Sequence, residues 1–110
     1  MVSFTKIAVA IGTLIVPAIA HSGDMTYYTP GLGSCGWTNS ESDMVVAMSP
    51  GQSGNCGKSI NIHYQGKTEK AKIVDKCPGC AGDSIDVSPT VFKKFASLDV
   101  GRIQVTWDFA

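Results

Sequence analysis

Apolar residues recur in short runs along the chain, and turn-forming residues separate the runs. The segments 59–64 and 102–109 alternate apolar and polar residues, which predicts strands with one buried face. The segment 44–48 is continuously apolar and predicts a strand buried on both faces. Further strands are expected at 25–28, 68–74 and 85–87. Short strands at this spacing are typical of an all-β barrel or sandwich, and a compact six-stranded barrel fits them.

Two details of this pattern can be checked in a structure. The inward faces of three expected strands are formed by Ile60, Ile62, Tyr64, Ala71, Ile73, Ile103, Val105, Trp107 and Phe109. One short helix is expected next, because Ser88 suits an N-cap and Pro89 suits the first helical position. The apolar residues that follow share one helix face: Val91, Phe92, Phe95 and Ala96.

The first twenty residues have a different pattern. Lys6 precedes an apolar run at 7–15, and the residues 17–20 end in an Ala-x-Ala pattern. This order is typical of a secretory signal peptide cleaved after Ala20, and the run is too short for a stable membrane span. We therefore expect a signal peptide at 1–20, one domain at 21–110, and a secreted, extracellular protein.

Charge excludes some partners. The chain has 9 basic and 9 acidic residues, so its formal net charge is zero. Neither a basic patch nor a run of like charge stands out, so we expect no nucleic-acid partner. A second long apolar segment is also missing, so we expect no membrane partner. The expected state is a monomer without a cofactor.

All four cysteines lie in the expected domain: Cys35, Cys56, Cys77 and Cys80. An even number in a short secreted chain predicts two disulfides, and three pairings can form them. The Cys-Pro-Gly-Cys segment also fits a redox pair or half of a zinc site. Redox chemistry would need a βαβ context, and zinc would need more soft ligands at regular spacing. Structural bridges are therefore the preferred interpretation.

Copper is a further alternative. His21 would begin the cleaved chain, and an N-terminal histidine with a second one, here His63, holds copper in secreted polysaccharide monooxygenases. Those enzymes are much larger, and their other motifs are absent here. We expect no metal.

Two acids stand at apolar strand segments. Asp75 follows Ile73 and Val74, and Asp86 lies between Ile85 and Val87. On neighbouring strands the two would face one another, as in a carbohydrate cleft or a hydrogen-bonded structural hub. A partly buried carboxyl has a raised pKa and suits a general acid, whereas an ordinary strand position would simply face solvent. Asp75 fits either a second site acid or an acceptor for backbone amides.

Three aromatic residues flank a glycine-rich loop at 30–33, namely Tyr27, Tyr28 and Trp37. Exposed rings can stack on sugar faces. Strand neighbours alternate, so at least one of the two tyrosines is expected in the core.

These segments, taken in order, resemble the double-psi β-barrel family of expansin first domains, barwin and rare lipoprotein A domains. The matching segments are 23–28, 35–36, 43–49, 56–58, 73–77, 85–88 and 101–107. A single secreted domain with a Cys-Pro-Gly-Cys turn is most similar to fungal expansin-like proteins of the loosenin kind. The resemblance implies a six-stranded double-psi barrel with one helix. It also implies binding and loosening of cell-wall polysaccharide, such as cellulose, chitin or a related glycan, without hydrolysis.

The resemblance assigns roles to single residues. Asp86 matches the general acid of related endoglucanases, while Thr26 and Asp75 match polar residues needed for wall loosening in bacterial expansins. The catalytic base of the endoglucanases falls at Thr29, so it is missing, which argues against hydrolysis. Barwin joins the cysteines that match Cys35 and Cys56, which leaves Cys77 to pair with Cys80.

Two other functions remain open. Secreted inhibitors of papain-type cysteine proteases share this fold and use loops rather than the groove. A peptidoglycan lytic transglycosylase would need one acid and no base, a requirement that Asp86 alone would satisfy.

Overall fold

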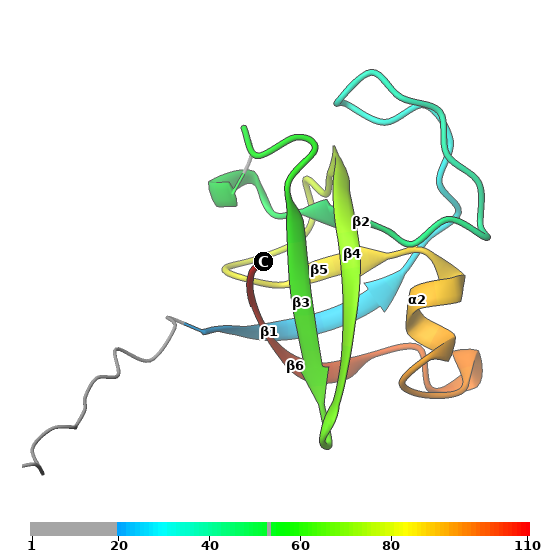
Figure 1. Cartoon of the computed structure of the whole chain (residues 1–110), viewed down its shortest axis with the longest axis vertical. Coiled ribbons are helices and arrows are strands. Elements are labelled where there is room, and N and C mark those ends of the chain that lie inside the picture. Colours follow the sequence, from blue (N-terminus) through cyan, green and yellow to red (C-terminus); the bar gives the residue numbers. More distant parts are fainter. Residues whose placement is uncertain (1–19, 53) are drawn as a thin grey trace, which may run out of the picture.

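The computed structural model describes residues 20–52 and 54–110, so the predicted signal segment lies outside the described residues except for Ala20. Six strands of this part close into a barrel in the order β1-β5-β2-β4-β3-β6 (Figure 1). The strands are β1 (His21–Tyr27), β2 (Val45–Met48), β3 (Ser59–Tyr64), β4 (Lys67–Lys76), β5 (Ile85–Val87) and β6 (Ile103–Phe109). The predicted six-stranded all-β barrel is confirmed.

Strand pairing explains where the boundaries differ from the prediction. β1 pairs parallel with β5, β2 pairs parallel with β4, and the other neighbouring strands are antiparallel. β1 begins at His21, earlier than its apolar pattern indicates, because its first residues pair with β6. β4 runs on to Lys76 because it pairs with the end of β2. Backbone hydrogen bonds to a neighbouring strand therefore extend both strands beyond their apolar cores.

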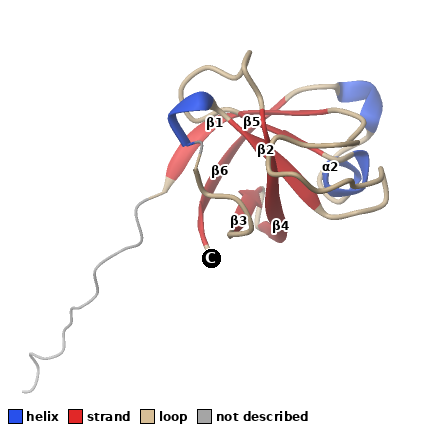
Figure 2. Ribbon diagram, turned by 90° about the horizontal axis from the view of Figure 1, so that it is seen from above, coloured by secondary structure: helices blue, strands red, loops and turns tan. Residues whose placement is uncertain are grey.

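The predicted helix is α2 (Pro89–Lys93), and it packs against β1 and β5 (Figure 2). The Ser88 hydroxyl accepts a hydrogen bond from the Val91 amide at 3.5 Å, which confirms the N-cap. The helix ends before Phe95, yet that ring is buried in the core. Two short 3-10 helices are also present, η2 (Pro50–Gln52) and η3 (Leu98–Val100).

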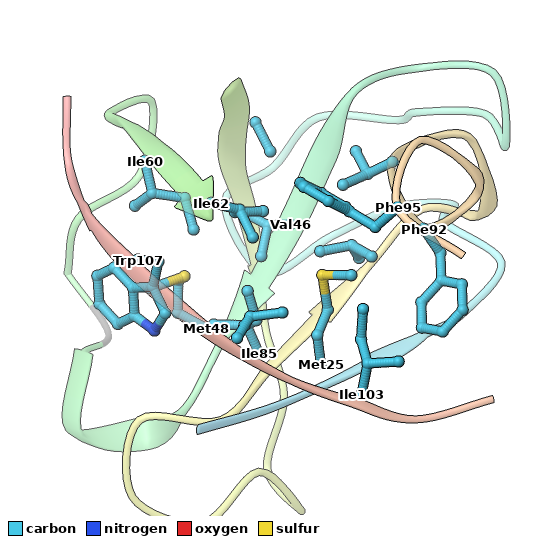
Figure 3. Packing of buried hydrophobic residues seen from close by; sticks show 14 of the residues in the cluster. Met25, Val46, Met48, Ile60, Ile62, Ile85, Phe92, Phe95, Ile103 and Trp107 are labelled. Carbon is cyan, nitrogen blue, oxygen red and sulfur yellow. The ribbon is translucent and has the colours of Figure 1, made fainter. Parts of the chain in front are cut away.

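One core fills the barrel (Figure 3). Trp107 lies at one end of it, and Phe92 and Phe95 lie at the end near α2. The inward positions of β3, β4 and β6 are as predicted, with two exceptions. Tyr64 is only partly buried, and Phe109, the last strand residue, is 39% exposed because it lies at the rim of the barrel. Among the described residues, none of the helices is long and apolar enough to span a membrane.

A β-bulge in β4 breaks the alternation of that strand. Val46 pairs with Ile73, and the next residue, Ala47, pairs with Asp75, so Val74 is an extra residue. Ile73 and Val74 are therefore both buried, at 2% exposure each. The bulge shifts the phase of the strand and sets the position of Asp75.

Candidate functional site

Strand register brings three of the predicted site residues into one row. Thr26 on β1 pairs with Asp86 on β5, Asp86 pairs with Ala47 on β2, and Ala47 pairs with Asp75 on β4. The sequence pattern predicted that the two acids lie on neighbouring strands, and this prediction is wrong. β2 lies between them, which separates their backbones by about 10 Å, two strand spacings. The small side chain of Ala47 is the only one between them in the row.

Asp86 is the acid of the row whose pKa is shifted. It is partly buried, and its Oδ1 accepts a hydrogen bond from the Thr26 hydroxyl at 3.1 Å. Burial raises the pKa of the Asp86 carboxyl, and the charge of Asp75 adds to the rise. The Thr26 bond and the charge of Arg102 oppose it. Asp86 therefore holds its proton to a higher pH than an ordinary aspartate does, which suits donation to a ligand oxygen.

Tyr28 contributes a hydroxyl near both acids. Its oxygen is buried, and it has no hydrogen-bond partner among the described residues. Burial raises the pKa of the Tyr28 phenol well above its usual range, and the charges of Asp75 and Asp86 raise it further. The Asp75 carboxylate contributes to this shift although it does not reach hydrogen-bond geometry with the phenol. A buried hydroxyl without a partner costs folding free energy.

Asp75 also organises the backbone. Its Oδ1 accepts hydrogen bonds from the amides of Ser34 and Lys76, both at 2.8 Å. The alternative that it bonds backbone amides is therefore correct, and one of its oxygens remains outside those two bonds. Gly33 explains how the loop can come so close. A Cβ at this position would lie 2.3 Å from the Val74 carbonyl oxygen, so only glycine fits without a shift.

Pockets flank the row at both ends. A pocket of about 310 Å³ lies beside Thr26, and it is also lined by Arg102, Asp24, Ser84 and the Cys77–Cys80 turn. Arg102 is held there by Asp24, with 2.8 Å between Nη1 and Oδ2. A second pocket of about 180 Å³ lies beside Asp75 and the Cys35–Cys56 bridge. The row crosses four strands from one pocket to the other, and its polar side chains are those of Thr26, Asp86 and Asp75.

The predicted aromatic residues are divided between two faces. Tyr27 points to the helix side, where its ring lies 5.0 Å from that of Phe92 and its hydroxyl donates to the Leu98 carbonyl at 3.0 Å. The structure does not bring Tyr27 to the row. Trp37 is 42% exposed, and the Lys72 ammonium lies 4.4 Å from its ring centroid. Its loop contacts the end of β4, where the Ser34 amide donates to Asp75.

Glu41 is the acid that sequence reasoning missed. Its carboxylate accepts a hydrogen bond from the Thr29 hydroxyl at 2.8 Å, and both side chains are exposed. A carboxylate thus lies beside the position where the endoglucanase base was expected, although it comes from a different part of the chain. A hydrogen bond between loop residues twelve positions apart leaves no periodic signal, so the sequence alone offered no pointer to it.

The structure also shows which partners the cysteines and histidines have. The disulfides are Cys35–Cys56 and Cys77–Cys80, as the barwin resemblance implied. His21 stacks on buried Trp107 at 4.1 Å and contacts Asp83, whereas His63 bonds Asp108 and Thr68 across neighbouring strands. The part of the chain that the structure describes contains no cluster of three or more His, Cys, Asp or Glu that could hold a metal.

Known proteins share both the sequence and the fold. A scan of protein-family models finds no match. The allergen Asp f 7 of Aspergillus fumigatus is 38% identical over 96 residues, which is 79% of this chain and 36% of the allergen. The papain inhibitor of Streptomyces mobaraensis is 37% identical over 100 residues, 80% of this chain and 70% of the inhibitor. The chain spans about a third of the allergen and most of the inhibitor.

Solved structures extend these relationships. The Streptomyces papain inhibitor superposes with a TM-score of 0.75 at 35% identity, covering 87% of this chain and 99% of that chain. An expansin of Clavibacter michiganensis in complex with cellohexaose gives 0.77 at 20% identity, over 84% of this chain and half of that one. The chain belongs to the expansin-like family of double-psi β-barrel proteins. This expansin-like protein also has two disulfides, and together with its allergen relatives they indicate an extracellular protein.

Proposed function

We propose that this expansin-like protein binds cell-wall polysaccharide along the row from Thr26 to Asp75 and loosens it without hydrolysis. The observation that carries the proposal is the partly buried Asp86 carboxyl, which accepts a hydrogen bond from Thr26 at 3.1 Å in a row that runs from one pocket to another. Groups of this kind bind ligand oxygens in polar clefts. A cellohexaose complex of a protein with the same fold supports a glycan as the ligand.

Each residue has a task in this proposal. Asp86 donates or accepts a hydrogen bond at a glycan oxygen, and Thr26 orients its carboxyl. Asp75 keeps the loop with Ser34 against the end of β4. Tyr28 supplies a polar contact between the acids, and Trp37 supplies an apolar surface on which a sugar ring stacks.

We expect binding without hydrolysis because the expected site residues do not supply both an acid and a base. Inverting hydrolysis needs one carboxyl as acid and a second as base, placed to hold a water between them. Asp75 is occupied by two backbone amides, and Thr29 presents a hydroxyl where the base was expected. Asp24, in the pocket beside Thr26, and Glu41 are the other carboxylates to be tested as a base.

The test is a pull-down of the protein expressed from residue 21 onward with insoluble cellulose, chitin and peptidoglycan, with soluble products measured in parallel. We expect binding to at least one glycan and no sustained release of sugar. Asp86→Asn and Tyr28→Phe should each weaken binding at least roughly fivefold, since each removes a charged or hydroxyl contact worth about 1–3 kcal/mol. Asp99→Asn, an exposed acid on η3, is the matched control and should bind normally.

Three results would contradict this proposal. Binding that is unchanged in both Asp86→Asn and Tyr28→Phe would place the glycan elsewhere on the protein. Sustained turnover that disappears in Asp86→Asn and in Glu41→Gln would identify a hydrolase with Glu41 as its base. Turnover on peptidoglycan that needs only Asp86 would instead indicate a lytic transglycosylase.

A second function, inhibition of a papain-type cysteine protease, is favoured by the relationship with the Streptomyces papain inhibitor. That inhibitor is 37% identical over 100 residues, a stronger sequence relationship than the 20% identity to the expansin. Papain assayed with a fluorogenic peptide, with and without the protein, tests this function. An unchanged rate at micromolar protein would exclude tight inhibition of papain.

A further inference from the structure

Arg102 stands where the row reaches the edge of β6. Met25 on β1 pairs with Ile103 on β6, and the two strands are antiparallel. The next residue of β1, Thr26, therefore lies across from Arg102, the residue that precedes Ile103. Met25 and Ile103 are buried, so alternation turns the side chains of Thr26 and Arg102 to the outer face of the barrel. Strand register thus adds a charged position to the β1 end of the row.

Asp24 holds the Arg102 side chain in the pocket beside Thr26. The Arg102 Nη1 donates to Asp24 Oδ2 at 2.8 Å, and Gln104 donates to the other oxygen of the same carboxylate. The Asp24 amide in turn donates to the Ser84 hydroxyl at 3.2 Å. The contact with Asp24 uses one guanidinium nitrogen, whereas a guanidinium has five N–H donors. The other donors are open to a ligand in the pocket, because the Arg102 side chain is 63% exposed.

Arg102 also acts on the Asp86 carboxyl. The polar and charged groups that face this carboxyl are the Thr26 hydroxyl, the Asp75 carboxylate and the Arg102 guanidinium. The positive charge of Arg102 favours the ionised form and lowers the pKa of Asp86, against the larger effect of burial. Two strand spacings, about 10 Å, separate Arg102 from Asp86 in the row, a span that one glycan chain can cover.

We propose that Arg102 binds the glycan at the β1 end of the row, in the pocket beside Thr26, and that Asp24 positions its guanidinium. This inference rests on the proposed glycan function and extends its binding site by one residue. The guanidinium donates hydrogen bonds to glycan oxygens. Asp24 balances its charge, so the pair suits the hydroxyl groups of a sugar.

The experiment measures binding isotherms on whichever of insoluble cellulose, chitin and peptidoglycan retains the wild type. Arg102→Met should weaken binding at least roughly fivefold, because it removes charge-assisted hydrogen bonds. Lys67→Met is the matched control, since Lys67 is an exposed cation at the other end of β4 from Asp75, and it should bind like the wild type. The melting temperature of Arg102→Met should stay within about 4 °C of the wild type, because an exposed ion pair contributes little to stability.

A double-mutant cycle tests the role of Asp24. If Asp24 acts through Arg102, the variant that combines Asp24→Asn with Arg102→Met should bind within about twofold of Arg102→Met alone. Losses that multiply in the combined variant would overturn the positioning role, because Asp24 would then contact the glycan independently.

NMR titration of the Asp86 carboxyl gives a readout that a purely structural residue would not move. The pKa of Asp86 should rise in Arg102→Met and stay the same in Lys67→Met, because only the first change removes a positive charge that faces Asp86. Equal pKa values in the wild type and in Arg102→Met would overturn the place of Arg102 in the row.

The binding results separate this inference from the proposed function. Binding that weakens in Asp86→Asn but not in Arg102→Met would overturn the role of Arg102 and leave the glycan function standing. A wild type that binds none of the three glycans would overturn both. Equal weakening in Lys67→Met and Arg102→Met would show a dependence on overall charge, and it would also overturn the inference.

Discussion

Gly33→Ala should destabilise the barrel, although it adds one methyl group in a loop. The added Cβ would lie 2.3 Å from the Val74 carbonyl oxygen and 3.2 Å from two Asp75 side-chain atoms, whereas ordinary contacts are 3.4–4 Å. The loop must therefore move by about 1 Å, and the obstacle is backbone that also accepts the Cys35 amide. Overpacking of this kind costs about 1–3 kcal/mol, and we expect the upper end of that range because a backbone carbonyl cannot rotate away.

A cost of about 3 kcal/mol corresponds to a melting temperature lower by about 12–24 °C in a domain of this size. Thermal unfolding followed by circular dichroism, together with urea midpoints, measures it. Gly31→Ala is the matched control two residues away. A Cβ there meets no atom within 4 Å, so its melting temperature should stay the same or rise slightly. If Gly33→Ala melted within about 2 °C of the wild type and still bound glycan normally, the close approach of the loop to β4 would be refuted.

Three further predictions concern stability. The native pKa of Asp86 lies above its ordinary value of 3.8, so its ionised form is penalised in the folded state. Asp86→Asn should therefore be more stable than the wild type at neutral pH, and melting curves should show the gain shrink as the pH falls through that raised pKa and vanish below 3.8. Tyr28→Phe should raise the free energy of unfolding by up to about 1 kcal/mol in urea titrations, because the hydroxyl it removes has no partner among the described residues. Replacing the Cys35–Cys56 bridge by serines should lower the free energy of unfolding by about 3 kcal/mol, and replacing the Cys77–Cys80 bridge should lower it by about 2 kcal/mol. The order follows from the sequence separations, which are 21 and 3. Equal urea midpoints for the two double mutants would contradict it.

Resemblance and local pattern together indicated much of the candidate site but not how it is assembled. Asp86, Thr26 and Asp75 were all indicated before the structure, and the register places them in one row. The sequence predicted only that the neighbouring side chains of Tyr27 and Tyr28 alternate between two faces. Which ring faces the helix depends on the packing of Phe92, which is distant in sequence. The Glu41 contact with Thr29 depends on the loop path and has no local signal.

The sequence by itself determined the local structure of this protein. Alternation predicted the strands, the Ser88-Pro89 pair predicted the helix start, and an even cysteine count predicted two disulfides. The strands and the helix start follow from interactions within a few residues, which a linear pattern contains, and the number of disulfides follows from the cysteine count alone.

Only the tertiary structure decided which strands are neighbours. β2 lies between the two acids, and the bulge at Val74 sets the phase with which Asp75 joins the row. Closure of the barrel depends on hydrogen bonds between strands distant in sequence, and one residue of slip would turn every side chain of a strand to the other face. Local pattern is almost the same for the alternative registers, so the site arises from long-range pairing that the linear sequence does not display.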